Sequence, residues 1–236
     1  MQSKKWRKFD ELTEKCYSNM IEMEEDGSCW QQAFELLKEI VREERQKDPS
    51  CMSQLVMVDD VADYAHDVQG WLEECLDEME EREDYETLLR MCDDLLEMFG
   101  WPEYSGSDIR FQKASALGAL GRKQEAAEYC RKWIRKEPEN IIAAVAGVYA
   151  LIGTRQYDEA EKLAARFIFD FSECTEENDV MFIALSRLYE AMGRKKEKRQ
   201  IDKAIEEYEE RMEEELANLD DDEYSFDDWD DGELPF

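Results

Sequence analysis

Apolar residues recur at steps of three and four along almost the whole chain, which is the stripe of an amphipathic helix. Between residues 85 and 99, for example, Leu88, Cys92, Leu95 and Phe99 follow this spacing. No stretch alternates between apolar and polar residues as a strand would. The pattern predicts an all-α protein with about eleven helices, near residues 3–24, 28–47, 52–66, 69–82, 85–99, 107–120, 123–136, 139–152, 156–170, 176–192 and 195–217.

Residue types at the ends of these stretches predict how some helices begin and end. Ser28 and Gln31 have the spacing of a capping box at the start of the second helix. Four glycines follow an apolar stripe, where a left-handed residue closes the last helical turn with least strain: Gly100, Gly121, Gly153 and Gly193.

A short pattern repeats in the second half of the chain. A small residue is followed after three positions by a large one and after seven by glycine. The three copies are Ala114-Leu117-Gly121, Ala146-Tyr149-Gly153 and Ser186-Tyr189-Gly193. Ala126 and Ala160, which follow the first two copies, lie 34 residues apart. A period of this length is typical of helical repeat proteins.

These residues resemble the tetratricopeptide (TPR) repeat, whose antiparallel helix pairs stack into an α-solenoid. The resemblance covers about residues 69–217. It departs from the family at Leu117, where tyrosine is usual, and at Lys198, where alanine is usual. The order of features is also loosely similar to the TPR portion of bacterial SEC-C-motif proteins. The sequence contains no C-x-C, so no zinc site is implied. The expected domains are a helical extension (1–68), TPR-like repeats (69–218) and a tail (219–236).

The net negative charge of the chain excludes some classes of binding partner. The chain has 61 acidic and 30 basic side chains and a formal net charge of −31. Such a chain repels nucleic acid and anionic membrane surfaces, so neither is expected as a partner. Residues 206–236 contain sixteen acidic residues and only Arg211 as a base, which predicts a disordered acidic tail from residue 219. The first residues show no apolar leader, so a cytoplasmic location is expected.

Residues that could carry chemistry are scattered. The seven cysteines form no C-x-C or C-x-x-C pair and are expected to be reduced and mostly buried. His66 is the only histidine, and the aspartates around Gly232 do not fit a calcium loop. Carboxylate pairs occur throughout and mark no acid–base site. We therefore expect no enzyme, no metal and no cofactor.

The TPR resemblance implies a concave groove lined by the first helix of each repeat. The residues at the groove positions are Glu73, Glu74, Asp77, Phe111, Gln112, Ser115, Asn140, Ala143, Ala144, Gly147, Ile183 and Arg187. One end of this set is acidic, and the other is apolar and small. Phe111, Ala143 and Ala144 stand where a clamp for a peptide's carboxylate needs Lys or Asn, so that function is not expected. The other interpretation is that these residues pack against neighbouring helices or face water.

The functional hypothesis is a non-catalytic adaptor that holds a peptide or protein segment with basic and apolar residues in the groove. The alternative is a polyanionic binder or chaperone of a basic protein, acting through the acidic tail. A basic cluster, made of Arg194, Lys195, Lys196, Lys198, Arg199 and Lys203, is either a solvated face or an internal partner of the tail.

Overall fold

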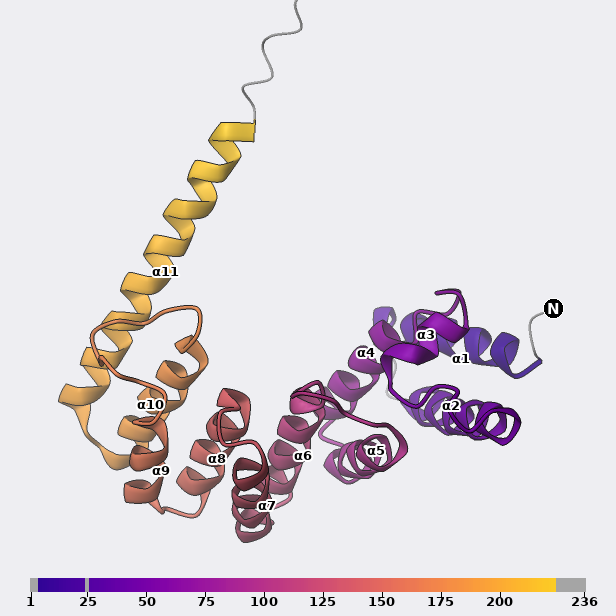
Figure 1. The fold of residues 1–236 in the computed structure, drawn as a ribbon, viewed down its shortest axis with the longest axis horizontal. Helices are drawn as coiled ribbons and strands as arrows, with labels where there is room; N and C mark the ends of the chain where they lie inside the picture. The colour runs from indigo at the N-terminus through magenta and orange to yellow at the C-terminus, as the bar shows by residue number, and fades with distance from the viewer. Residues whose placement is uncertain (1–3, 24–25, 224–236) are drawn as a thin grey trace, which may run out of the picture. The chain divides into compact units, whose positions relative to one another are not determined.

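The computed structural model describes residues 4–23 and 26–223, and side chains are described up to residue 217. The described residues form eleven α-helices and no strand (Figure 1). Their bounds are α1 Lys4–Ile21, α2 Ser28–Lys47, α3 Val56–Val61, α4 Val68–Glu81, α5 Tyr85–Met98, α6 Ser107–Ala119, α7 Lys123–Lys136, α8 Ile141–Gly153, α9 Tyr157–Ala164, α10 Asp179–Met192 and α11 Lys195–Glu223.

The predicted all-α class and the number of helices are confirmed for this part of the chain. Two helices are much shorter than predicted, α3 and α9. The last helix continues to Glu223, beyond the predicted boundary at residue 218. The rest of the predicted acidic tail, residues 224–236, lies outside the described residues.

Four helix pairs are closed by the same backbone turn: α4–α5, α6–α7, α8–α9 and α10–α11. In each turn one residue has a positive φ, namely Glu83 (56°), Gly121 (74°), Arg155 (60°) and Gly193 (71°). The next residue donates its N–H to the carbonyl five positions back, at 2.9 Å in every case, as in Asp84 to Met79 and Arg122 to Leu117. This is the Schellman arrangement, and the following helix starts one residue later.

The predicted helix ends are therefore right at Gly121 and Gly193 and wrong at Gly100 and Gly153. Only the first two have a positive φ, because Gly153 completes α8 and Arg155 takes the left-handed position. The predicted capping box is also wrong. Ser28 makes no cap on α2; its own N–H donates to Asp26 Oδ1 (2.9 Å), and Gln31 reaches Asp84 instead.

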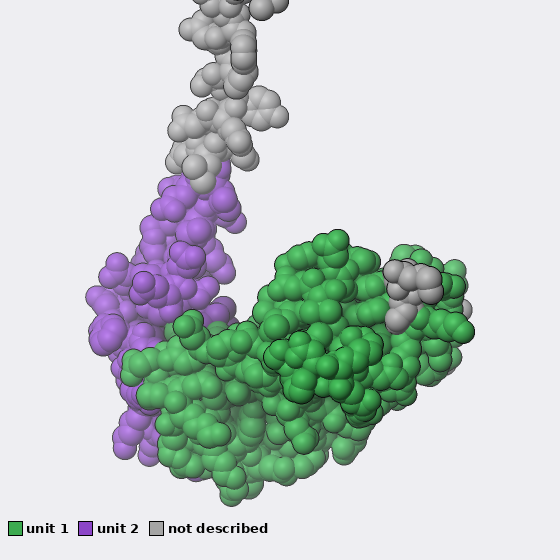
Figure 2. All heavy atoms as spheres, turned by 45° about the vertical axis from the view of Figure 1, so that its right-hand side comes forward, with its two compact units in different colours: residues 1–146 green, residues 147–236 purple. Residues whose placement is uncertain are grey.

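The chain divides into two compact units, residues 1–146 and 147–236, at a point inside α8 (Figure 2). In unit 1, aromatic side chains link α1, α2 and α4. Phe9 meets Trp71 edge-on at 5.0 Å between ring centroids, and Trp71 stacks on Trp30 at 6.1 Å. All three are buried. The predicted N-terminal extension (1–68) thus shares its core with α4, which begins the predicted TPR-like region.

In unit 2, α10 packs against both α9 and α11. Phe182 and Leu185 on α10 are fully buried, as is Ile201 on α11. Polar contacts hold the same elements together. Glu161 on α9 accepts hydrogen bonds from the Tyr189 hydroxyl (3.1 Å) and from Arg194 (2.7 Å), the residue just before α11.

The shared turn makes a prediction about two glycines three residues apart. A Cβ atom at either Gly118 or Gly121 would meet nothing within 4 Å, so packing does not distinguish them. Gly118 lies inside α6, where alanine should raise the free energy of unfolding by about 0.5–1 kcal/mol. Gly121 is left-handed, and Gly121→Ala should lower it by about 1 kcal/mol. Urea unfolding followed by circular dichroism measures both; changes of the same sign would contradict the assigned turn.

Candidate functional site

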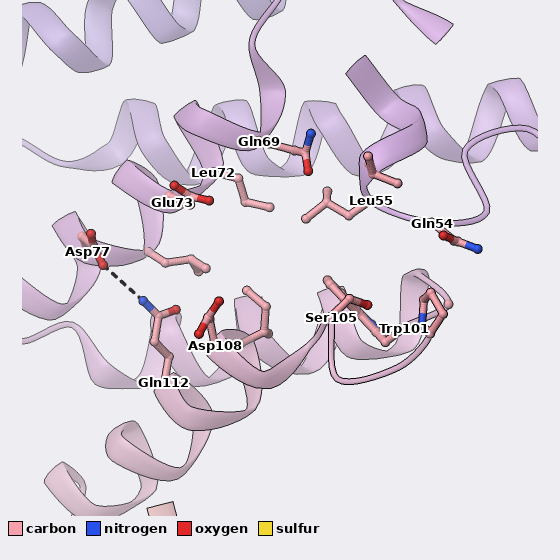
Figure 3. A pocket seen from close by; sticks show the side chains of 15 residues that line it. Gln54, Leu55, Gln69, Leu72, Glu73, Asp77, Trp101, Ser105, Asp108 and Gln112 are labelled. Carbon is pink, nitrogen blue, oxygen red and sulfur yellow. Dashed lines mark hydrogen bonds between the residues drawn. The ribbon is translucent and has the colours of Figure 1, made fainter. Parts of the chain in front are cut away.

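A pocket of about 610 Å³ lies in unit 1 (Figure 3). Its walls are α4, α6, the segment before α3 and the loop that follows α5. The lining residues are Gln54, Leu55, Val56, Gln69, Leu72, Glu73, Leu76, Asp77, Gly100, Trp101, Pro102, Ser105, Asp108, Ile109 and Gln112. They come from four separate parts of the sequence, so the pocket exists only in the folded chain.

Arg45, on α2, fixes the two loops that form one end of the pocket. Its guanidinium donates to the Met98 carbonyl (2.7 Å) and to the Met52 carbonyl (2.5 Å), and it lies over the Phe99 ring at 5.4 Å. Burial lowers the pKa of Arg45. One side chain thus ties the end of α5 to the segment that leads into α3. The Gly100 N–H completes the link by donating to the Ser53 carbonyl (2.8 Å).

Asp59, on α3, fixes the first turn of α4. Its carboxylate is almost fully buried and accepts the backbone N–H groups of Val68 (2.7 Å) and Gln69 (3.0 Å). It also accepts from the Gln69 side chain (3.1 Å), which lines the pocket. A carboxylate at a helix N-terminus satisfies otherwise unpaired N–H groups and interacts favourably with the helix dipole. This cap holds the pocket wall of α4 in place.

The lining combines an apolar floor with an acidic end. Leu72, Leu76 and Ile109 are buried, whereas Val56 at the edge is 49% exposed. Figure 3 shows Glu73, Asp77 and Asp108 toward one end of the pocket, and Trp101 toward the other.

None of the lining residues is Lys or Arg, and no Lys or Arg side chain pairs with Glu73, Asp77 or Asp108 within the part of the chain that the structure describes. The acidic end therefore presents three carboxylates without a cation among the lining residues.

Three of the predicted groove residues line this pocket: Glu73, Asp77 and Gln112. Glu74 is exposed on α4 but outside the lining, and Phe111 and Ser115 are half-buried on α6 outside it. Ile183 and Arg187 are exposed on α10 in unit 2, where Arg187 pairs with Glu190 at 3.2 Å.

The remaining four predicted groove residues are Asn140, Ala143, Ala144 and Gly147, and the structure buries all of them. Asn140 caps α8, because its Oδ1 accepts the N–H groups of Ile142 (3.0 Å) and Ala143 (3.2 Å). Its Nδ2 donates to Ser107 Oγ at 2.9 Å. Asn140 thus joins the start of α8 to α6, and the burial of all four residues means that they do not form an exposed groove lining.

Sequence reasoning missed the residues that loops bring to the pocket, notably Leu55 and Trp101. Groove positions counted along TPR helices cannot include such segments. The available signal is Trp101 itself, because a large aromatic side chain just after a predicted helix end has much apolar surface to bury against a neighbouring element. Asp108 and Ile109 were missed because the groove positions counted on α6 begin at Phe111.

Three of the six residues in the basic cluster near the start of α11 form ion pairs within unit 2. Arg194 pairs with Glu161 (2.7 Å) and Glu197 (2.9 Å), Lys198 with Asp202 (2.7 Å), and Lys203 with Glu207 (2.5 Å). A helix rises about 1.5 Å per residue, so α11 holds Glu223 roughly 30 Å or more from every residue of this cluster. The tail beyond residue 223 lies outside the described residues, so docking of the tail on this cluster stays a prediction.

His66 contributes to the core of unit 1. Its ring stacks on Trp6 at 4.3 Å between centroids, and Nδ1 lies 2.5 Å from Asp10 Oδ1. No three His, Cys, Asp or Glu residues within the described ranges are placed to hold a metal ion.

Hydrophobic length gives a separate result: among the described helices, none is both long and apolar enough to cross a bilayer.

No family model matches the chain, and neither a curated protein nor a solved structure matches it. The function therefore has to be inferred from the pocket residues themselves.

The cysteines yield a prediction about thiol reactivity. All seven are free and all but Cys51 are buried. Burial raises the pKa of Cys92 and Cys130 to about 12 and that of Cys174 to about 11, which disfavours the reactive thiolate. We expect one fast-reacting thiol with an aromatic disulfide reagent in native buffer, and seven in denaturant. Cys51→Ser should remove the fast phase and Cys174→Ser should leave it; a second fast thiol would contradict the packing described.

Arg45 yields a prediction about the loops. Arg45 uses two separate nitrogens, Nη1 for the Met98 carbonyl and Nη2 for the Met52 carbonyl, and the single nitrogen of lysine does not reproduce this fork. Arg45→Lys should therefore lower the free energy of unfolding by about 1–3 kcal/mol. It should also speed hydrogen exchange of the Gly100 amide. The matched control is Arg42→Lys on the exposed side of α2, which should change stability by less than about 0.5 kcal/mol. Equal effects of the two substitutions would show that Arg45 does not pin the loops.

Proposed function

We propose that this chain is a non-catalytic, cytoplasmic adaptor of TPR-like helical repeats. Its pocket binds a segment of a partner protein that carries apolar and basic side chains. The observation that carries the proposal is the composition of the pocket: an apolar floor and three carboxylates with no cation among the lining residues. Burial of an apolar side chain of the partner against this floor makes the free energy of binding more favourable. A Lys or Arg beside that side chain is attracted to the acidic end.

The repeated turn supports the TPR-like part of the proposal. Repeat proteins build one supersecondary unit several times, and each unit buries its apolar face against the next. Four helix pairs here share a left-handed residue and a 2.9 Å hydrogen bond at the same position in the turn. The free, mostly buried cysteines support a reducing compartment such as the cytoplasm.

Peptide display tests the proposal with the full-length chain. A random-peptide library is selected on the wild type, and enriched peptides are resynthesised and titrated by fluorescence anisotropy. We expect them to contain Lys or Arg near an apolar residue. Glu73→Gln with Asp108→Asn, and separately Val56→Ser, should each weaken binding about three- to tenfold. The matched control is Glu74→Gln, an exposed acid of α4 outside the pocket, which should leave the affinity within about twofold.

A tail variant separates this proposal from the polyanionic alternative. It replaces Asp227, Asp228, Asp230 and Asp231 by Asn within the full-length chain. Binding through the pocket should survive this change and persist, though weakened, above about 0.3 M salt. Peptides that lose affinity with the tail variant but not with the pocket variants would overturn the pocket proposal.

A further inference from the structure

One hydrogen bond crosses the acidic end of the pocket and joins its two helical walls. Gln112 Nε2, on α6, donates to Asp77 Oδ1, on α4, at 3.1 Å (Figure 3). Asp77 is exposed and Gln112 is half-buried. The other end of the same amide is unsatisfied, because Gln112 Oε1 is buried without a hydrogen-bond partner. The contact thus joins the Asp77 carboxylate to the neutral amide of Gln112, and the carbonyl oxygen of that amide has no hydrogen-bond partner.

The cations of α6 nearest this bridge are engaged elsewhere. Lys113, the next residue, pairs with Asp93 on α5 and lies over the Tyr129 ring at 4.7 Å. Arg110 lies over the Trp133 ring at 5.9 Å and reaches Glu137 at 3.9 Å. Neither lines the pocket. The chain therefore offers Asp77 a neutral amide at the position where a cation would bind more strongly.

We infer that the Asp77–Gln112 hydrogen bond is a latch that the partner's Lys or Arg displaces. This inference rests on the proposed function and adds the residue pair that makes the pocket select a cation. An ammonium or guanidinium forms a charge-assisted pair with the Asp77 carboxylate, which the neutral amide cannot match. A segment without a cation does not displace the Asp77–Gln112 hydrogen bond, so α4 and α6 stay joined at this end of the pocket.

Substitutions at position 112 test the latch, with the resynthesised display peptide as the probe. Gln112→Lys supplies Asp77 with an internal cation and should weaken binding about tenfold. Gln112→Ala removes the latch and should leave the affinity unchanged or raise it a few fold. Asp77→Asn removes the carboxylate and should weaken binding about three- to tenfold. Ser115→Lys, which adds the same charge to α6 outside the pocket, is the matched control and should have little effect.

The outcomes separate the latch from the pocket itself. A Gln112→Ala variant that loses as much affinity as Asp77→Asn would show that Gln112 is an ordinary ligand contact, and the latch would be wrong. Gln112→Lys binding as tightly as wild type would overturn it as well. If the peptide depends on Glu73 and Asp108 but ignores position 112, only the latch fails. If the wild type selects no peptide, or if Glu73 and Asp108 have no effect, the proposed function and the latch both fail.

The side-chain amide of Gln112 gives an independent readout. Its two ¹⁵N-coupled proton signals should shift on addition of the peptide and should not shift with the same peptide after its Lys or Arg is replaced by norleucine. Shifts of equal size with both peptides would contradict displacement by a cation.

Discussion

The backbone turn that reverses each helix pair is the constraint on which the rest of the structure depends. A left-handed residue and the 2.9 Å hydrogen bond behind it let the second helix begin one residue later, against the first. The turn is retained even where the residue is not glycine. Glu83 and Arg155 adopt positive φ at a conformational cost of about 1 kcal/mol each. Helix pairing repays this cost by burying apolar side chains such as Met79 and Leu88 on either side of the first turn.

Helix pairs alone do not make the pocket, which needs two loops held in fixed positions. Arg45 supplies this by bonding to carbonyls at the ends of both loops, and Asp59 caps α4 from the neighbouring helix. Both are polar groups in largely buried surroundings, where each hydrogen bond contributes more than it would at the surface. The pocket is therefore held by buried polar contacts, whereas the helix pairs are held by apolar burial.

The division between these two kinds of contact explains what could be predicted from the sequence. Periodicity reports apolar burial on helices, so the fold class and most helix bounds follow from it. Periodicity does not predict helix bounds where a polar side chain of one helix caps another helix. Asp59 turns inward to cap α4, and Asp63 and Tyr64 adopt positive φ, so α3 stops at Val61 rather than filling residues 52–66.

The same distinction applies to the predicted groove residues. Helical register assigns Glu73, Asp77 and Gln112 to the predicted groove, and all three line the pocket. Register could not show that Ala143 and Ala144 are buried, because small apolar residues suit a close helix contact and an open groove equally well. Nor could it bring Trp101 and Leu55 to α4 and α6, since their positions depend on the two carbonyl contacts of Arg45.

Net charge alone does not explain the acidic end of the pocket. With 61 acidic and 30 basic side chains, many acids must lack a partner, but composition does not say which. On α6, Arg110 lies over the Trp133 ring and Lys113 over the Tyr129 ring, both on α7. These cations serve the packing of α6 and α7 and are not available to Glu73, Asp77 and Asp108. Each cation also has an acidic partner outside the pocket, since Lys113 pairs with Asp93 and Arg110 reaches Glu137. The negative end of the pocket therefore follows from how α6 is held against α5 and α7, and not from the lining residues alone.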